Sequence, residues 1–326
     1  MLTIDGARLE GGGQIVRMAV ALSSLTGTAV QIVRIRAKRD NPGLAAQHIS
    51  AIRAVSIPSR AEVSGLSPSS SSLSFSPSPL QKSDISIDVG TAGNVSLVLQ
   101  TWLPIGLKVG GRILVRGGTE VQHSPTIDYL VRVFLPLLRK YGARVELSIL
   151  KRGYYPKGGG LVQATVEPAH LTPLNITAEG TEAGIISCSS NLPDHVVVRQ
   201  ASAARKRLKE DLGINPLVYL DRRTGQSTGS SCTAWCGTKG GIALGRRGYP
   251  AESVGTEAAD MLINEIRAGG TVDTHLADQL LIYLALYGGS YTTGSLSLHA
   301  QTMHWLLGEF GFDVKIRPNK VVEFEA

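Results

Sequence analysis

Residues 13–37 read GQIVRMAVALSSLTGTAVQIVRIRA, a run with helical apolar spacing, then a glycine, then an alternation of apolar and polar residues. Apolar residues that recur every three or four positions predict an amphipathic helix, and strict alternation predicts a half-buried strand. Gly27 stands where the end of a helix needs a residue in the left-handed conformation. The stretch therefore predicts a helix followed by a strand of a sheet.

The same unit recurs at residues 93–117, 126–150 and 299–318. Helical spacing predicts further helices at about 43–55, 123–140, 195–212, 252–268 and 275–287. Several copies of one unit, each burying one sheet face under helices, predict an α/β (α+β) fold.

The pattern is interrupted twice along the chain. Residues 175–248 do not follow it, so we expect them to form an inserted small α/β domain, and residues 1–174 and 249–326 to form the large domain. The Ser/Pro-rich residues 64–79 predict a mobile surface loop around a short strand, SLSF.

Composition limits the class of protein. No apolar run approaches the roughly 18 residues that a membrane span needs, and the N-terminus has no secretory signal, so we expect a cytoplasmic protein. Three cysteines form no disulfide framework, and Cys232 and Cys236 lack a second pair of zinc ligands. The net charge is +7, and residues 1–60 hold eight Lys and Arg against three acids, which suits a polyanionic partner.

Glycine-rich turns precede several of the predicted helices. LEGGGQIVR, residues 9–17, places three glycines at a helix start, where uncovered backbone N–H groups can bind an anion. A tight strand-to-helix turn explains this stretch equally well. Similar turns occur at 90–94, 116–120 and 154–160, and several such turns favour a phosphate-rich ligand more strongly than one turn would.

A basic segment follows the first helix. In RIRAKRD, residues 34–40, the two-residue period of a strand puts Arg34, Arg36 and Lys38 on one face, with Arg39 beyond them. The planar fork of Arg suits bidentate capture of phosphate oxygens. A solvated edge strand protected by charge is the alternative.

The histidines include candidates for chemistry. His48, His123, His275, His299 and His304 lie near polar or glycine-rich junctions, and spacing alone does not choose among them. His299 stands where the alternating TGSLSLH meets a helix, and a neutral imidazole exposed there is a nucleophile. In HLADQ, Asp278 falls in the first turn of a helix, where it either interacts with the helix dipole or orients a ribose or a metal.

Eight motifs, in this order, resemble the RNA 3'-terminal phosphate cyclase family: EGGGQIVR, IRAKRDNPGLAAQH, VGTAGNVSLVLQT, RGGTEVQHSPTIDYL, GYYPKGGG, GYPAESVG, HLADQL and SLHAQT. The resemblance covers about residues 1–175 and 245–318. It implies repeated βαβαββ modules interrupted by a small α/β unit.

The resemblance also implies a reaction. A ligase of this family converts an RNA 3'-terminal phosphate into a 2',3'-cyclic phosphodiester at the expense of ATP. His299 would attack ATP and form a covalent histidyl-AMP, which would pass its AMP to the RNA before the ring closes. ATP and RNA with a 3'-terminal phosphate are the implied partners, with Mg²⁺ or Mn²⁺ as the metal.

Residue roles follow from the matched motifs. His299, Arg36, Arg39 and Asp278 would be catalytic, and Glu10 would bind the metal. ATP would contact residues from most of the motifs: Arg17, Gln47, His48, Gln100, Pro125, Tyr129, His275, Leu276, Ala277, Asp278 and Gln279. Among these, Pro125, Tyr129 and His275 would form the adenine pocket.

Two other functions share features of this pattern. One is a catalytically silent cyclase-like protein of ribosome assembly, against which the presence of His299, Arg36, Arg39 and Asp278 argues. The other is an enolpyruvyl-transferase-like enzyme, a class without a comparable HLADQ and SLH pair. Aromatic residues are only 5% of the chain and no stacking platform is evident, so we expect RNA contacts to be confined to the terminal nucleotides.

Overall fold

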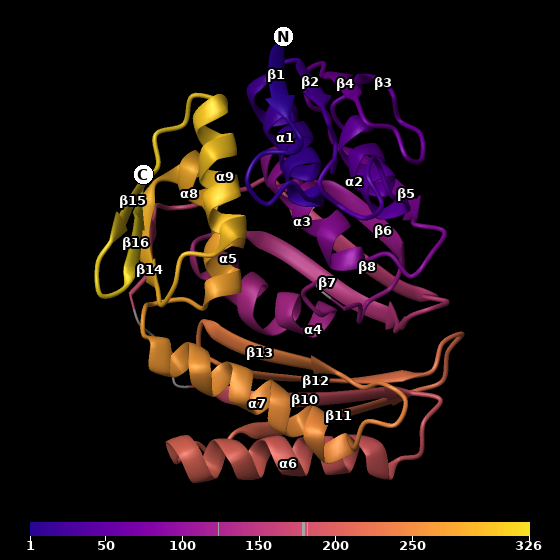
Figure 1. The fold of residues 1–326 in the computed structure, drawn as a ribbon, viewed down its shortest axis with the longest axis vertical. Helices are drawn as coiled ribbons and strands as arrows, with labels where there is room; N and C mark the ends of the chain where they lie inside the picture. Colours follow the sequence, from indigo (N-terminus) through magenta and orange to yellow (C-terminus); the bar gives the residue numbers. More distant parts are fainter. Residues whose placement is uncertain (123, 178–179, 181) are drawn as a thin grey trace.

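The computed structural model describes residues 1–122, 124–177, 180 and 182–326. The first module is a four-stranded sheet with two helices (Figure 1). Its elements are β1 (Leu2–Asp5), α1 (Gly13–Thr26), β2 (Val30–Val33), α2 (Ala46–Ser56), β3 (Glu62–Ser64) and β4 (Leu73–Ser76). The strand order is β1-β2-β4-β3, with β1 and β2 parallel and the other neighbours antiparallel.

The second module repeats this arrangement with the order β5-β6-β8-β7. Its elements are β5 (Ser83–Asp88), α3 (Val95–Val109), β6 (Gly111–Gly117), a helix made of α4 (Ile127–Tyr129), the π-helical turn η1 (Leu130–Phe134) and α5 (Leu135–Lys140), then β7 (Arg144–Lys151) and β8 (Gly160–Glu167). Again only the first two strands, β5 and β6, are parallel.

The third module has the same pairing, with the order β15-β16-β14-β9. Its elements are β9 (Leu174–Asn175), α8 (Thr274–Tyr287), β14 (Gly289–Thr293), α9 (Leu298–Glu309), β15 (Lys315–Pro318) and β16 (Val322–Glu325). The predicted α/β fold of repeated βαβαββ modules is therefore confirmed, and a long insertion separates β9 from α8.

The insertion forms a small unit with its own sheet, ordered β11-β10-β12-β13. Its elements are β10 (Ala183–Ser190), α6 (His195–Leu212), β11 (Leu217–Arg223), β12 (Gly229–Cys236), β13 (Lys239–Leu244) and α7 (Ala251–Ala268). Ile185 packs under α6 and α7, whereas the next residue, Ile186, faces the opposite way into the main core. The division into two domains stays a prediction, and the packing of α7 on this sheet favours a boundary after Ala268.

Helices of different modules pack against one another in the large part of the molecule (Figure 1). Helix α1 contacts α2, α3 and α9, and α8 contacts α3 and α9. Fully buried large side chains such as Trp102, Phe134, Tyr283 and Tyr291 fill this core. None of the helices in the described residues is long and apolar enough to cross a membrane.

The helix predictions at 195–212, 252–268 and 275–287 are confirmed to within one residue by α6, α7 and α8. The strand predicted through Arg34, Arg36 and Lys38 is wrong, because β2 ends at Val33. Arg34 and Arg36 each have a φ of 52°, in the left-handed region, so the chain turns where an extended strand was expected.

Candidate active site

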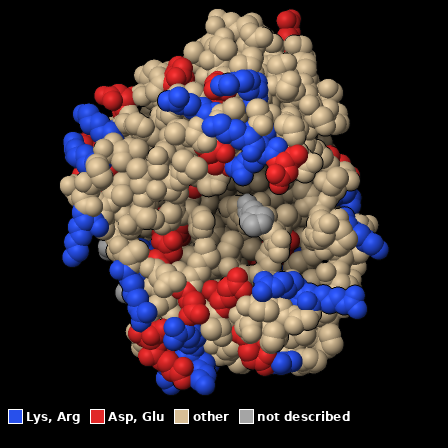
Figure 2. Space-filling view, in the orientation of Figure 1, with Lys and Arg blue, Asp and Glu red and all other residues tan. Residues whose placement is uncertain are grey.

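A cavity of about 850 Å³ lies where helices of all the modules begin. Among its lining residues, Gly13, Gln47, Leu97, His275 and His299 stand in the first turns of α1, α2, α3, α8 and α9. Figure 2 shows the hollow with Lys and Arg side chains gathered above it. The N-terminus of a helix carries uncovered N–H groups and partial positive charge, so the cavity favours an anionic ligand.

The small unit supplies another wall of the cavity. Gly240, Ile242 and Leu244 of β13 and Met261 of α7 line it opposite the module helices. Tyr129 connects the two parts, because its hydroxyl donates to Asp273 at 2.7 Å and the same carboxylate accepts from the Gly240 N–H at 2.9 Å. A larger residue than glycine at position 240 would overlap the Tyr129 ring.

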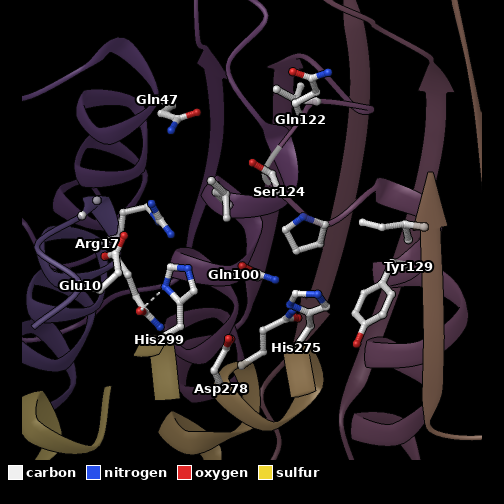
Figure 3. A pocket seen from close by; sticks show the side chains of 18 of the residues that line it. Glu10, Arg17, Gln47, Gln100, Gln122, Ser124, Tyr129, His275, Asp278 and His299 are labelled. Carbon is white, nitrogen blue, oxygen red and sulfur yellow. Dashed lines mark hydrogen bonds between the residues drawn. The ribbon is translucent and has the colours of Figure 1, made fainter. Parts of the chain in front are cut away.

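His299 points into the cavity from the first turn of α9 (Figure 3). Ser297 caps this helix by accepting from the Ala300 N–H at 2.9 Å. The Nδ1 atom of His299 lies 3.0 Å from Oε1 of Gln14. An amide oxygen can only accept, so Nδ1 carries the hydrogen and Nε2 keeps its lone pair. Burial, helped by the charge of Arg17, lowers the pKa of His299 and favours this neutral, nucleophilic form.

Three arginines of the first module supply positive charge to the cavity. Arg17 is 8% exposed and forms no ion pair with any described residue. Burial lowers its pKa to about 10, an effect that Asp278 partly offsets, so Arg17 stays charged at neutral pH. Arg36 donates to the Gly43 carbonyl at 2.8 Å, and Arg39 pairs with Glu10. The planar forks of these side chains can bind phosphate oxygens.

The glycines before α1 leave room for two side chains that line the cavity. A Cβ atom on Gly12 would overlap the Glu10 carboxylate, and one on Gly13 would overlap Nε2 of His48. His48 is fixed because its Nδ1 accepts from the Ala45 N–H at 3.0 Å. Burial, together with nearby Arg17 and Arg36, lowers the pKa of His48 to about 3, so the ring is neutral and its Nε2–H is a donor.

Several polar atoms around the cavity are buried without a hydrogen-bond partner among the described residues. They are Oε2 of Glu10, Nε of Arg17, Nε2 of Gln100, Oε1 of Gln279 and the hydroxyl of Tyr283. Buried polar groups are normally paired, and leaving them unpaired costs stability. Their arrangement around one cavity fits a polar ligand that would supply the missing partners.

Two acidic side chains lie at the start of α8, and one of them, Asp278, lines the cavity. Asp273 begins α8 as its N-cap, accepting from the Leu276 N–H at 2.7 Å, and burial raises its pKa to about 6. Asp278, one turn further, projects into the cavity (Figure 3). Burial raises the pKa of Asp278 well above its usual range, and the charge of Arg17 opposes this shift.

The structure brings most of the sequence-predicted residues to this one cavity: Glu10, Arg17, Arg36, Arg39, Gln47, His48, Gln100, Pro125, Tyr129, His275, Asp278, Gln279 and His299. Leu276 and Ala277 do not line it, because their side chains are 0% and 1% exposed in the core. His304 bonds the Val314 carbonyl at 2.8 Å and is not among the lining residues, and His123 lies outside the described residues.

Gln14 and the small-unit residues of the wall were not predicted from the sequence. Gln14 directly follows three glycines at a helix start, and that position was the available signal. Ile242, Leu244 and Met261 carry no such signal, because apolar residues in a strand and a helix predict core packing.

The chain is similar to known proteins over almost its whole length. A family model described as RNA 3'-terminal phosphate cyclase matches residues 8–317. Proteins named RNA 3'-terminal phosphate cyclase from Methanococcoides burtonii and Methanosarcina barkeri are 45% and 46% identical to this chain, each match covering 98% of it and 97% of the relative. One from Archaeoglobus fulgidus is 44% identical, covering 99% of both chains. The chain belongs to the RNA 3'-terminal phosphate cyclase family.

Proposed function

We propose that this protein is an ATP-dependent ligase that converts the 3'-terminal phosphate of an RNA into a 2',3'-cyclic phosphodiester. The observation that carries the proposal is a neutral His299, oriented by Gln14, in a cavity lined by Arg17, Arg36 and Arg39. The relatives that match this chain over nearly their whole length are named as cyclases, which argues against the assembly-factor and enolpyruvyl-transferase alternatives.

In the first step, Nε2 of His299 attacks the α-phosphorus of ATP. The new N–P bond forms as the bond between the α-phosphorus and the bridging oxygen breaks, and pyrophosphate leaves with the electron pair. Nδ1 keeps its hydrogen bond to Gln14, so the imidazole can take up positive charge without moving. The guanidinium groups of Arg17, Arg36 and Arg39 stabilise the charge on the leaving phosphates.

In the second step, an oxygen of the RNA 3'-phosphate attacks the phosphorus of histidyl-AMP. The N–P bond breaks, His299 is regenerated and a phosphoanhydride joins the RNA to AMP. The adjacent 2'-hydroxyl then attacks the 3'-phosphorus, AMP leaves and the hydroxyl proton passes to solvent. This closure is intramolecular, so positioning supplies most of what it needs.

The cavity also has residues that could hold a metal ion and the adenine of ATP. Glu10 has one buried oxygen without a partner among the described residues, and the described part of the chain contains no cluster of three or more His, Cys, Asp or Glu that could hold a metal. A single carboxylate suits Mg²⁺ or Mn²⁺ that takes its remaining ligands from phosphate and water, and such an ion would shield phosphate charge. Pro125, Tyr129 and His275 would contact the adenine. The three free cysteines fit a cytoplasmic location, where thiols stay reduced.

The proposal is tested by following the α-phosphate of ATP. Protein incubated with Mg²⁺ and ATP labelled on that phosphate should retain label after denaturation, and acid but not alkali should release it, as a phosphoramidate requires. RNA with a 3'-phosphate should discharge the label, whereas RNA with a 3'-hydroxyl should not.

His299→Ala should lose the label while it keeps the wild-type unfolding temperature. His195→Ala, which changes an exposed histidine of the small unit, is the matched control and should label normally. Full labelling of the His299 variant would refute the assignment of His299 as the nucleophile.

A further inference from the structure

A well-held loop exposes a tyrosine beside the cavity. Tyr155 is 75% exposed, whereas the preceding Tyr154 is 4% exposed. The loop is fixed through Ser227, whose hydroxyl accepts from the Tyr154 N–H at 2.7 Å and donates to the Gly158 carbonyl at 2.8 Å. The Gly158 N–H closes the loop by donating to the Tyr154 carbonyl at 2.8 Å. The Tyr155 ring thus stands in solvent on a rigid support.

Hydrogen bonds place one end of this loop against the cavity rim. The Gly153 carbonyl accepts from the backbone N–H groups of Thr119 and Glu120, at 2.8 and 3.2 Å. The next two residues, Val121 and Gln122, line the cavity.

The tip of the loop also packs against the rim, through the turn before α3. Gly158 packs so tightly on the turn before α3 that a Cβ atom on it would lie 2.9 Å from the Thr91 carbonyl oxygen. At the end of this turn, the Asn94 N–H donates to Gln47 at 3.3 Å, and Gln47 lines the cavity. Gln47 and Gln122 lie on the side of the pocket away from Asp278 (Figure 3). The loop that carries Tyr155 therefore packs against this side of the rim.

The chemistry of the loop suits single-stranded RNA. An exposed aromatic face binds a base by stacking, and a neighbouring cation binds the backbone. Lys157 is exposed and forms no ion pair within the described part of the chain. Tyr219, the other exposed aromatic side chain among the large hydrophobic residues of the described segments, is 37% exposed and already stacks with Trp235 and Arg132.

We propose that Tyr155 and Lys157 form a subsite for a nucleotide upstream of the RNA 3' end, with the base stacked on Tyr155 and its phosphate near Lys157. This inference rests on the proposed function. It extends RNA recognition beyond the terminal nucleotides to which the low aromatic content had confined it.

The test compares substrates of different length. For an RNA of about ten nucleotides with a 3'-phosphate, Tyr155→Ala should raise KM about tenfold, equivalent to about 1.4 kcal/mol, and leave kcat unchanged. For a dinucleotide with a 3'-phosphate, the same variant should match the wild type, because no base reaches the subsite. Tyr155→Phe keeps the ring and should behave as wild type with both RNAs.

Two further variants complete the test. Lys157→Gln should reduce the slope of log KM against log salt by about one for the longer RNA. Leu217→Ala removes an exposed apolar side chain from the first residue of β11, and its KM and kcat should match the wild type with both RNAs. An unchanged KM for Tyr155→Ala with the longer RNA, or an equal loss with both RNAs, would overturn the subsite.

These outcomes are separable from failure of the proposed function. All the variants should form histidyl-AMP from ATP alone at the wild-type rate, since the loop lies outside the ATP-binding residues. If the wild type forms no histidyl-AMP or does not cyclise either RNA, the proposed function fails before the subsite is tested.

Discussion

At the scale of single residues, the buried charge of Arg17 affects two histidines. Burial is the main reason that His48 and His299 resist protonation, and Arg17 adds electrostatic repulsion to both. The consequences differ, because His48 presents an N–H donor to the cavity and His299 a lone pair. One arginine can thus bind phosphate and also keep His299, the proposed nucleophile, unprotonated.

The low pKa of His48 makes stability depend on pH. An unfolded histidine has a pKa of about 6.5, so between pH 6.5 and 3 the unfolded chain binds a proton that the folded protein does not. The free energy of unfolding therefore falls by up to about 1.4 kcal/mol for each pH unit below 6.5. His48→Asn keeps an acceptor near Nδ1 but cannot be protonated, so its free energy of unfolding should fall less steeply.

Urea unfolding at pH 7.5, 6 and 5 measures this difference. The two proteins should diverge as the pH falls, and parallel profiles would refute the assignment. His195→Asn, at an exposed position, should follow the wild type.

At the scale of elements, the first turn of α1 leaves the space that the His48 ring occupies. Gly13→Ala would drive Cβ into Nε2 of His48, so we expect histidyl-AMP formation to fall by at least tenfold while the unfolding temperature changes little. Gly308→Ala is the matched control, because a Cβ atom at this position of α9 has no atom within 4 Å among the described residues. It should keep full labelling and stabilise the protein by about 0.5–1 kcal/mol, as alanine does in a helix. Normal labelling of Gly13→Ala would contradict the close packing of His48 on this turn.

Helices were predictable from sequence and the basic turn was not, for a physical reason. The period of apolar residues in α6, α7 and α8 is local, so it can be read along the chain. The left-handed conformations of Arg34 and Arg36 are intrinsically unfavourable for residues with a Cβ. They are stabilised by distant contacts, such as the Ile35 N–H to the Ser71 carbonyl at 2.9 Å. Local sequence therefore favoured a strand that the tertiary structure replaces.

At the scale of the whole molecule, the insertion within the third module completes the cavity. The site residues of the modules were predictable because they lie in motifs that resemble those of the family, and many of these motifs stand at a glycine turn or helix start. The wall from β13 and α7 was not, because it depends on how the small unit docks. That docking is made by contacts between residues far apart in sequence, such as Tyr129 with Asp273 and Asp273 with Gly240.

A buried ionic cluster also joins the small unit to the second module. The guanidinium of Arg152, 1% exposed, contacts Glu120 at 2.8 Å, Asp128 at 2.7 Å and Asp221 of β11 at 2.8 Å. Burial and the charge of Asp128 raise the pKa of Glu120 well above its usual range, which reduces the excess of negative charge in the cluster. Cys188 of β10 adds a hydrogen bond from its thiol to Asp128 at 3.4 Å.

Removal of Arg152 should therefore weaken the whole molecule. Arg152→Met leaves carboxylates buried without their cation, and we expect it to lower the free energy of unfolding by about 3 kcal/mol, measured by urea denaturation at neutral pH. Arg199→Met breaks an exposed pair with Glu252 and should leave the free energy of unfolding nearly unchanged. Adding Glu120→Gln and Asp128→Asn to Arg152→Met should recover part of the loss, because the remaining buried groups are then neutral. Equal costs for Arg152→Met and Arg199→Met would mean that the cluster does not stabilise the junction, and the docking of the small unit would then depend on its apolar face and on Asp273.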